Sequence, residues 1–163
     1  MRRLSLSIPL LAMAFAACGS PATPPPTAAP PAALAFGQTH TWPGGDTVTV
    51  SAPRRMSEEP SSTDGHAGQF LVVDVTVRNG GTGVRSAQQY LTLATINDRS
   101  VDYAVMRGHA DLVRSSASIP PGGSLTWSEA YPVAGAAPVK FQVQAMGAAF
   151  DSQRPVVFYE GTV

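Results

Sequence analysis

Short runs in which apolar and polar residues alternate recur along most of the chain. In the run 69–79 (QFLVVDVTVRN), the odd-numbered residues from 71 to 77 are leucine or valine, and residues 74, 76 and 78 are polar. A period of two residues is typical of a strand that buries one face. The run is therefore predicted to be a strand whose valines face the core.

Seven other segments are also predicted to be strands, and turn residues separate them. The sequence "RNGGTG" at 78–83 is one strong turn signal, and Asn97 with Asp98 indicates a hairpin turn. No segment shows a convincing long helical period, so the chain is predicted to be all-β, an antiparallel β-sandwich of about 7–9 strands. The seven segments are 36–42, 47–53, 90–96, 101–105, 124–133, 139–146 and 155–161.

The first 17 residues have the layout of a secretory signal peptide. A positive Met1-Arg2-Arg3 precedes the apolar run "LSLSIPLLAMAFAA", which ends in small residues. That run is shorter than the roughly 20 apolar residues that a transmembrane helix needs. We therefore expect residues 1–17 to direct export and to be removed.

The sequence "FAACG" around the single cysteine resembles the lipobox of bacterial lipoproteins. The resemblance implies cleavage between Ala17 and Cys18, and a diacylglycerol group on the Cys18 sulfur. The alternative is an unmodified cysteine inside an uncleaved hydrophobic segment. A chain with one cysteine cannot form an internal disulfide, so we expect the core alone to stabilise the domain.

Proline and small residues dominate the next segment, "GSPATPPPTAAPPAA". Such a composition cannot form a packed core, so residues 18–35 are predicted to be a disordered linker that carries the lipidated cysteine. In polyproline II geometry, about fifteen residues span roughly 45 Å. The folded domain is predicted to occupy residues 36–163.

Charge and composition exclude one class of partner. Charged residues make up 13% of the chain, and eleven basic residues balance eleven acidic ones. Removal of the signal peptide would also remove Arg2 and Arg3 and leave the chain slightly acidic. A protein with this balance lacks the basic surface that nucleic acid requires, so no nucleic-acid partner is expected.

Several segments of the predicted domain resemble a known protein family. The start at Phe36-Gly37, the strand "FLVVDVTVRN" and the turn "PPGG" before a strand are similar to domains related to a mycobacterial secreted immunogenic antigen. The resemblance covers residues 36–163 and implies an Ig-like β-sandwich in a bacterial, actinobacterial lipoprotein. These motifs are signatures of a fold, and none of them is an active-site motif.

A search for catalytic and metal-binding patterns identifies no site. His40, His66 and His109 lie far apart in sequence, and none forms a pair with zinc-ligand spacing. No catalytic residue, metal or cofactor is therefore expected. Two weaker alternatives remain open, which are a hydrolase whose residues converge from separate strands and a copper carrier that uses Met106 with His109.

Two long polar connections, 53–68 and 106–118, are predicted to be loops that could bind a partner. Binding residues on Ig-like scaffolds often lie on loops carried by rigid sheets, although the first connection could equally be a disordered insertion. The candidate binding residues are Arg54, Arg55, Asp64, His66, Arg107 and His109.

Glu129 is the acidic residue that conflicts with the strand pattern. It is in phase with Leu125, Trp127 and Tyr131, so a regular strand would turn its carboxylate inward. A β-bulge that redirects the side chain is the favoured interpretation, and a buried carboxylate paired with an arginine is the alternative.

Together these features predict a cell-envelope lipoprotein. The lipid would hold the protein to the outer face of the cytoplasmic membrane, and the sandwich would be a non-catalytic module that binds an envelope or extracellular protein or a small ligand. A structural spacer or an envelope chaperone is a further alternative to the hydrolase and the copper carrier.

Overall fold

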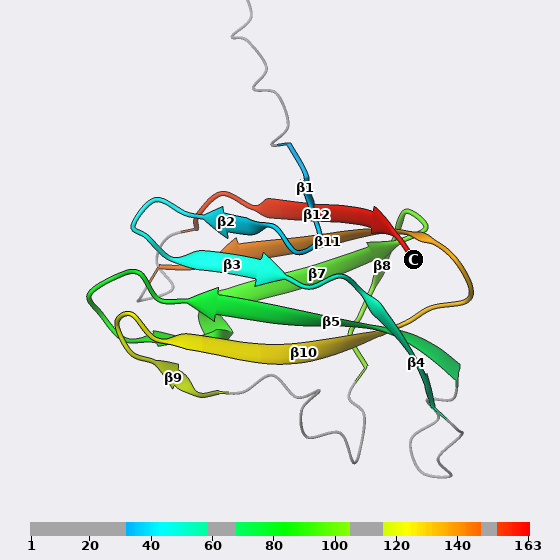
Figure 1. Ribbon diagram of the computed structural model, residues 1–163, viewed down its shortest axis with the longest axis horizontal. Helices are drawn as coiled ribbons and strands as arrows, with labels where there is room; N and C mark the ends of the chain where they lie inside the picture. The colour runs from blue at the N-terminus through cyan, green and yellow to red at the C-terminus, as the bar shows by residue number, and fades with distance from the viewer. Residues whose placement is uncertain (1–31, 59–67, 105–115, 148–152) are drawn as a thin grey trace, which may run out of the picture.

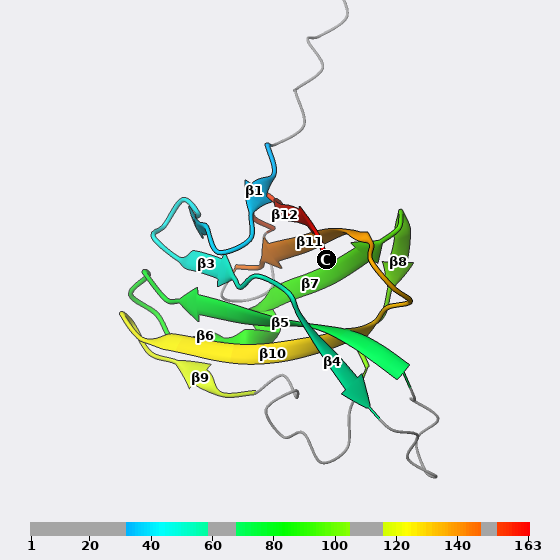
Figure 2. The ribbon, with the colours of Figure 1, turned by 45° about the vertical axis from the view of Figure 1, so that its right-hand side comes forward.

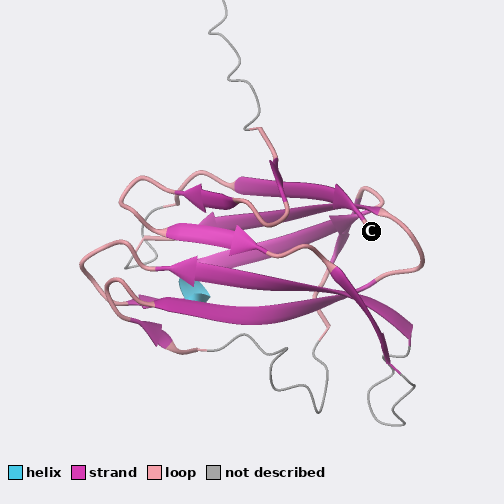
Figure 3. Cartoon of the chain, viewed as in Figure 1, coloured by secondary structure: helices cyan, strands magenta, loops and turns pink. Residues whose placement is uncertain are grey.

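The computed structural model describes residues 32–58, 68–104, 116–147 and 153–163. Within these ranges, strands dominate the chain, and the helical structure is one turn of 3-10 helix, η1 (Ala87–Gln89) (Figure 3). Two five-stranded sheets face each other and enclose the core (Figure 1). The chain therefore forms the two-layer β-sandwich that the sequence predicted.

The first sheet, sheet A, has the strand order β1-β12-β11-β7-β8. Its central strands pair antiparallel, whereas the short β1 at one edge pairs parallel with β12. At the other edge, Asn97 and Asp98 form the tight turn from β7 to β8 with positive φ angles of 50° and 60°, as the sequence predicted. The strands are β1 (Leu34–Ala35), β7 (Tyr90–Ile96), β8 (Arg99–Val101), β11 (Pro138–Ala145) and β12 (Val157–Thr162).

The second sheet, sheet B, has the order β10-β5-β3-β2, and β4 also pairs with β5. The long strand β5 organises this sheet because β3 pairs with its second half and β4 with its first half. Figure 2 shows β4 diverging from the sandwich beside the start of β5. The strands are β2 (Thr39–Thr41), β3 (Thr47–Val50), β4 (Arg54–Glu58), β5 (Gly68–Arg78) and β10 (Ser124–Pro132), while β6 (Arg85–Ser86) and β9 (Ser118–Ile119) form a small separate pair.

The main core lies between the two sheets and contains the residues that the period-two pattern selected. The odd-numbered residues 71–77 of β5 are all at most 1% exposed, and β11 alternates buried and more exposed positions in the same way. Large aromatic side chains fill the space between the sheets, as the contact of Trp42 with Tyr90 and that of Tyr131 with Phe141 show.

A second hydrophobic cluster lies on the outer face of sheet B. Phe70 and Val72 project there from β5, opposite the main core, and pack with Ala130 and Ala104. The chain reaches this face after β8, where the Ala104 amide donates to the Ala130 carbonyl over 2.7 Å. The first half of β5 is consequently buried on both faces.

The structure corrects three predicted boundaries. A strand begins at Leu34, two residues before the predicted start of the domain at 36, because Leu34 pairs with Tyr159 of β12. The strand predicted at 101–105 lies earlier, at Arg99–Val101, because the Asn97-Asp98 turn starts its pairing with β7 at once. Residues 54–58, predicted to belong to a loop, form β4 because the start of β5 offers them a free edge.

Candidate functional site

Arg54 and Arg55 lie on a strand and not in the predicted loop, and their predicted binding role stays a prediction. Both lie on β4, where their backbone pairs with β5. The Arg54 guanidinium lies 3.6 Å from the Asp74 carboxylate. Arg55 donates to the Gln69 side chain over 3.1 Å and to the Gly135 carbonyl over 2.7 Å. Both side chains are exposed, and their contacts hold β4 to β5 and to the connection between β10 and β11.

The other candidate residues lie outside the described residues. This applies to Asp64 and His66 in the first predicted loop, and to Arg107 and His109 in the second. Met106 and the predicted processing site, Ala17 and Cys18, also lie outside them. Their roles stay predictions.

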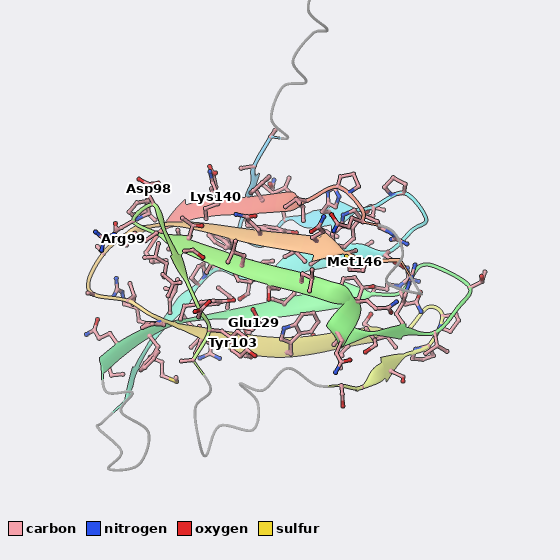
Figure 4. The ribbon with its side chains drawn as sticks, turned by 180° about the vertical axis from the view of Figure 1, so that it is seen from behind. Asp98, Arg99, Tyr103, Glu129, Lys140 and Met146 are labelled. Atoms are coloured by element: carbon pink, nitrogen blue, oxygen red, sulfur yellow. The ribbon has the colours of Figure 1, made fainter. Side chains whose placement is uncertain are left out.

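Glu129 lies between the two sheets, and the predicted bulge is absent. The register of β10 against β5 is unbroken from Ser124 to Pro132, so the Glu129 side chain points inward. It is 3% exposed, and Figure 4 shows it between β7 and β10. The buried position given by the alternative interpretation therefore agrees with the structure, and the predicted pairing of this carboxylate with an arginine stays a prediction.

Among the described residues, three neutral side chains donate to the Glu129 carboxylate. The Trp127 indole and the Thr92 hydroxyl donate to Oε1 over 2.8 and 2.9 Å, and the Tyr131 hydroxyl donates to Oε2 over 2.6 Å. Both carboxylate oxygens thus accept hydrogen bonds from sandwich residues, which offsets much of the cost of burying the group. The arrangement joins β10 to β7 across the core.

Asp46 is a second buried carboxylate, and the sequence analysis did not identify it. It is 1% exposed at the end of the sandwich where β3 begins. Its Oδ2 lies 2.7 Å from Arg154 and 3.1 Å from Arg85, and its Oδ1 accepts from the Gly80 amide over 3.0 Å. The partners are 34 to 108 residues away in sequence, so no local motif could have indicated this cluster.

A surface hollow of about 460 Å³ lies where β7, β11 and β12 meet on sheet A. We call it the Lys140 hollow. Its charged residues are Asp98, Lys140 and Glu160, and its polar wall includes Thr95 and Thr162. Figure 4 shows Asp98 and Lys140 at the same end of the sheet.

The only lysine of the chain is positioned by two contacts in this hollow. Lys140 Nζ lies 2.8 Å from a Glu160 oxygen and 5.8 Å from the centre of the Phe158 ring. The hydrogen bond from Lys140 to Glu160 raises the pKa of the ammonium group, so it is charged at neutral pH. The hollow therefore presents one cation beside two carboxylates. The sequence analysis did not identify Lys140 as a site residue, because a pattern along one strand cannot reveal which side chains of β7 and β12 lie beside it.

Within the described ranges, no three histidine, cysteine, aspartate or glutamate side chains lie close enough to form a metal site. The described residues also contain no helix with the length and apolar character needed to cross a bilayer.

No known protein family matches the chain, and no curated protein matches its sequence. Solved structures of similar fold exist. The yjhA protein of Bacillus subtilis has a TM-score of 0.56 and 16% identity, over 76% of this chain and 97% of that chain. The secreted protein MPT63 of Mycobacterium tuberculosis has a TM-score of 0.52 and 19% identity, over 83% of this chain and all of that chain.

An uncharacterised β-sandwich protein of Clostridium difficile 630 gives a TM-score of 0.51 and 12% identity, over 83% of this chain and 98% of that chain. At these identities the likeness is one of fold. It confirms the predicted β-sandwich, and it places a mycobacterial secreted protein among the structures of similar fold, in agreement with the resemblance seen in the sequence. The chain is therefore a two-sheet β-sandwich whose fold is similar to that of these proteins.

Proposed function

We propose that the protein is a cell-envelope lipoprotein that presents a non-catalytic Ig-like binding module outside the cytoplasmic membrane. The lipobox-like sequence before Cys18 and the proline-rich segment after it support the anchor and the tether. The two-sheet sandwich supports the rigid module. The similar fold of a secreted mycobacterial protein is compatible with a location outside the cytoplasm.

The Lys140 hollow is the observation on which the proposed binding role rests. Its volume of about 460 Å³ falls within the range of small-molecule sites. Its three charged side chains come from the β7–β8 turn, β11 and β12, so a rigid sheet fixes their spacing. A ligand or protein segment that carries both an ammonium and a carboxylate group would complement this arrangement.

A non-catalytic role agrees with the contacts of the buried carboxylates. Glu129 and Asp46 both accept hydrogen bonds from the protein itself, and both are at most 3% exposed. A catalytic carboxylate must instead reach a reacting atom of the substrate. In the described residues, these two carboxylates connect parts of the fold to one another.

The anchor is tested by metabolic labelling with an alkyne fatty acid. We expect the intact chain to carry the label in the membrane fraction, and the Cys18→Ser variant to lose the label. An unlabelled intact chain, or equal labelling of the variant, would contradict the anchor and would leave the binding proposal untouched.

The binding site is tested by photo-crosslinking in intact cells. A photoreactive amino acid at Thr162, in the hollow, is compared with one at Ser124, which is exposed on sheet B. We expect a specific adduct from position 162 and none from position 124.

A charge exchange at the hollow refines this test. Lys140→Glu should remove the adduct, and the double variant with Glu160→Lys should restore the ion pair and the folding stability without restoring the adduct. Adducts that persist in both variants would show that the partner binds elsewhere.

A further inference from the structure

The Asp46 cluster carries more positive than negative charge. Arg85 and Arg154 both contact the same oxygen of the single Asp46 carboxylate, at 3.1 and 2.7 Å. Their side chains are only 11% and 17% exposed, so water reaches them poorly. Among the described residues, two guanidinium groups and one carboxylate leave an excess of one positive charge in a largely buried setting. Buried charge without a counterion is unfavourable.

The Tyr90 hydroxyl supplies an independent observation. Tyr90 is 1% exposed, and among the described residues its oxygen is the buried side-chain polar atom that has no hydrogen-bond partner. A buried hydroxyl without a partner costs about 1–3 kcal/mol. Proteins usually satisfy such a group, and this hydroxyl is available to donate to a bound acceptor.

Backbone contacts place Tyr90 beside the charged cluster, because Tyr90 pairs with Ala145 and the Ala145 carbonyl accepts from the Arg154 amide over 2.9 Å. Burial raises the pKa of Tyr90 to about 12, the Asp46 carboxylate adds to the rise, and the Arg85 and Arg154 guanidiniums oppose it. The hydroxyl is therefore protonated and able to donate at any physiological pH.

We propose that Arg85, Arg154 and the Tyr90 hydroxyl form a binding site for a small monovalent anion, either a halide or a carboxylate group. An anion here would neutralise the excess charge and accept the orphaned hydrogen bond at the same time. Asp46 holds the two guanidiniums in place and limits the excess to one charge, which favours a monovalent over a divalent anion. The site lies at the β3 end of the sandwich and involves none of the residues of the Lys140 hollow.

Thermal unfolding of the full chain in mild detergent tests the proposal. Sodium chloride and sodium acetate are compared with sodium gluconate at equal concentration and ionic strength. Gluconate is also a carboxylate, but its long polyhydroxylated chain is too bulky for a largely buried site. A site with a Kd of about 10 mM raises the Tm by about 3 to 6 °C at 100 mM anion. Stabilisation by both small anions indicates a general site, whereas stabilisation by one of them identifies a halide or a carboxylate site. Equal Tm values in the three salts overturn the proposal.

Substitutions distinguish a specific anion site from a general salt effect, because the Tm of each variant is compared between the three salts. Tyr90→Phe keeps the ring and removes the hydroxyl, so it should weaken anion binding about tenfold and leave the Tm in gluconate unchanged or higher. Arg154→Gln removes the excess charge and should abolish the difference between the salts. Asp46→Asn increases the excess and should strengthen anion binding while lowering the Tm in gluconate.

An undiminished salt difference in Tyr90→Phe would show that the hydroxyl takes no part, and it would overturn the proposed site. This comparison stays decisive even where Arg154→Gln or Asp46→Asn fails to fold, since the tyrosine variant deletes an atom that has no partner within the described structure.

Discussion

Replacing Asn79 with alanine should destabilise the protein more than its small side chain suggests. Asn79 follows directly after β5 and is fully buried. Its amide nitrogen donates to the Gly83 carbonyl over 2.7 Å and to the Ile119 carbonyl over 2.9 Å. Its amide oxygen accepts from the Gly81 amide over 3.0 Å. One side chain thus holds the turn after β5 and connects it to β9.

The magnitude follows from these three hydrogen bonds. The bonds with Gly83 and Gly81 contribute roughly 1 kcal/mol each, and loss of the third leaves the buried Ile119 carbonyl without this donor, which costs about 1–3 kcal/mol. The free energy of unfolding of Asn79→Ala should therefore fall by about 3 to 5 kcal/mol. This loss is a large part of the 5–15 kcal/mol typical of a domain.

Urea unfolding followed by tryptophan fluorescence measures the loss. Both tryptophans, Trp42 and Trp127, are at most 3% exposed, so unfolding changes their surroundings. With an m-value of about 2 kcal/mol/M, the midpoint of Asn79→Ala should fall by about 1.5–2.5 M with the slope unchanged.

Asn79→Asp is the matched control because it keeps the size and the acceptor but replaces the donor. Its carboxylate would face the Gly83 and Ile119 carbonyls, so at pH 7 it should be at least as unstable as the alanine variant. An aspartate variant as stable as the wild type, or an alanine variant that loses less than about 1 kcal/mol, would refute the assigned role of the amide.

Three further predictions concern backbone contact and pH. Gly80→Ala should lower the free energy of unfolding by about 3 kcal/mol or more, because its Cβ would lie 2.0 Å from the Gly45 carbonyl oxygen. The control Gly83→Ala, whose Cβ would lie within 4 Å of no described residue other than its chain neighbours, should change that free energy by less than about 0.5 kcal/mol in the same urea assay. Burial raises the pKa of Tyr159 to about 12, so the stabilising contribution of its protonated hydroxyl is present below pH 10 and is lost as the pH rises toward 12. Urea midpoints measured at pH 9, 10, 11 and 12 should therefore decline less steeply for Tyr159→Phe than for the wild type. Burial lowers the pKa of His40 below 6.5, so the histidine binds a proton more readily in the unfolded chain, and the free energy of unfolding should fall as the pH drops below 6.5. His40→Phe should lose less stability than the wild type between pH 7 and pH 5. An equal loss in both proteins would contradict the role given to His40.

The sequence predicted the elements whose pattern is local. The valines of β5 and the alternation of β11 each have one buried face, and that face is visible in a period of two residues. The Asn97-Asp98 turn was predictable because these residues tolerate a positive φ. Such signals depend on neighbours within one segment.

Features that depend on distant partners were not predictable in this way. Phe70 and Val72 lie next to the apolar odd-numbered residues of β5, and such a continuous apolar run is consistent with a strand buried on both faces. The sequence alone could not show which residues pack on the outer face. The charged residues 54–58 have weak strand preference and form β4 because the edge of β5 is available.

The same limit applies to the polar sites. The strand pattern indicated that the Glu129 side chain points inward, but its hydrogen-bond donors include Thr92, which is 37 residues away on the opposite sheet. The partners of Asp46 come from three separate loops or strands, and the Lys140 hollow forms where three elements meet. A pattern along one strand cannot show which side chains the fold brings together.

The attachment of β1 also determines how the domain would respond to mechanical load. This strand forms only two residue pairs with β12, whereas β10 pairs with β5 along nine residues. Tension that enters through residues 32–33 would peel β1 away first and then load the three pairs between β2 and β3. The entry strand would thus yield as a compliant element, and the long β5–β10 ladder would keep the rest of the sandwich intact during the pull.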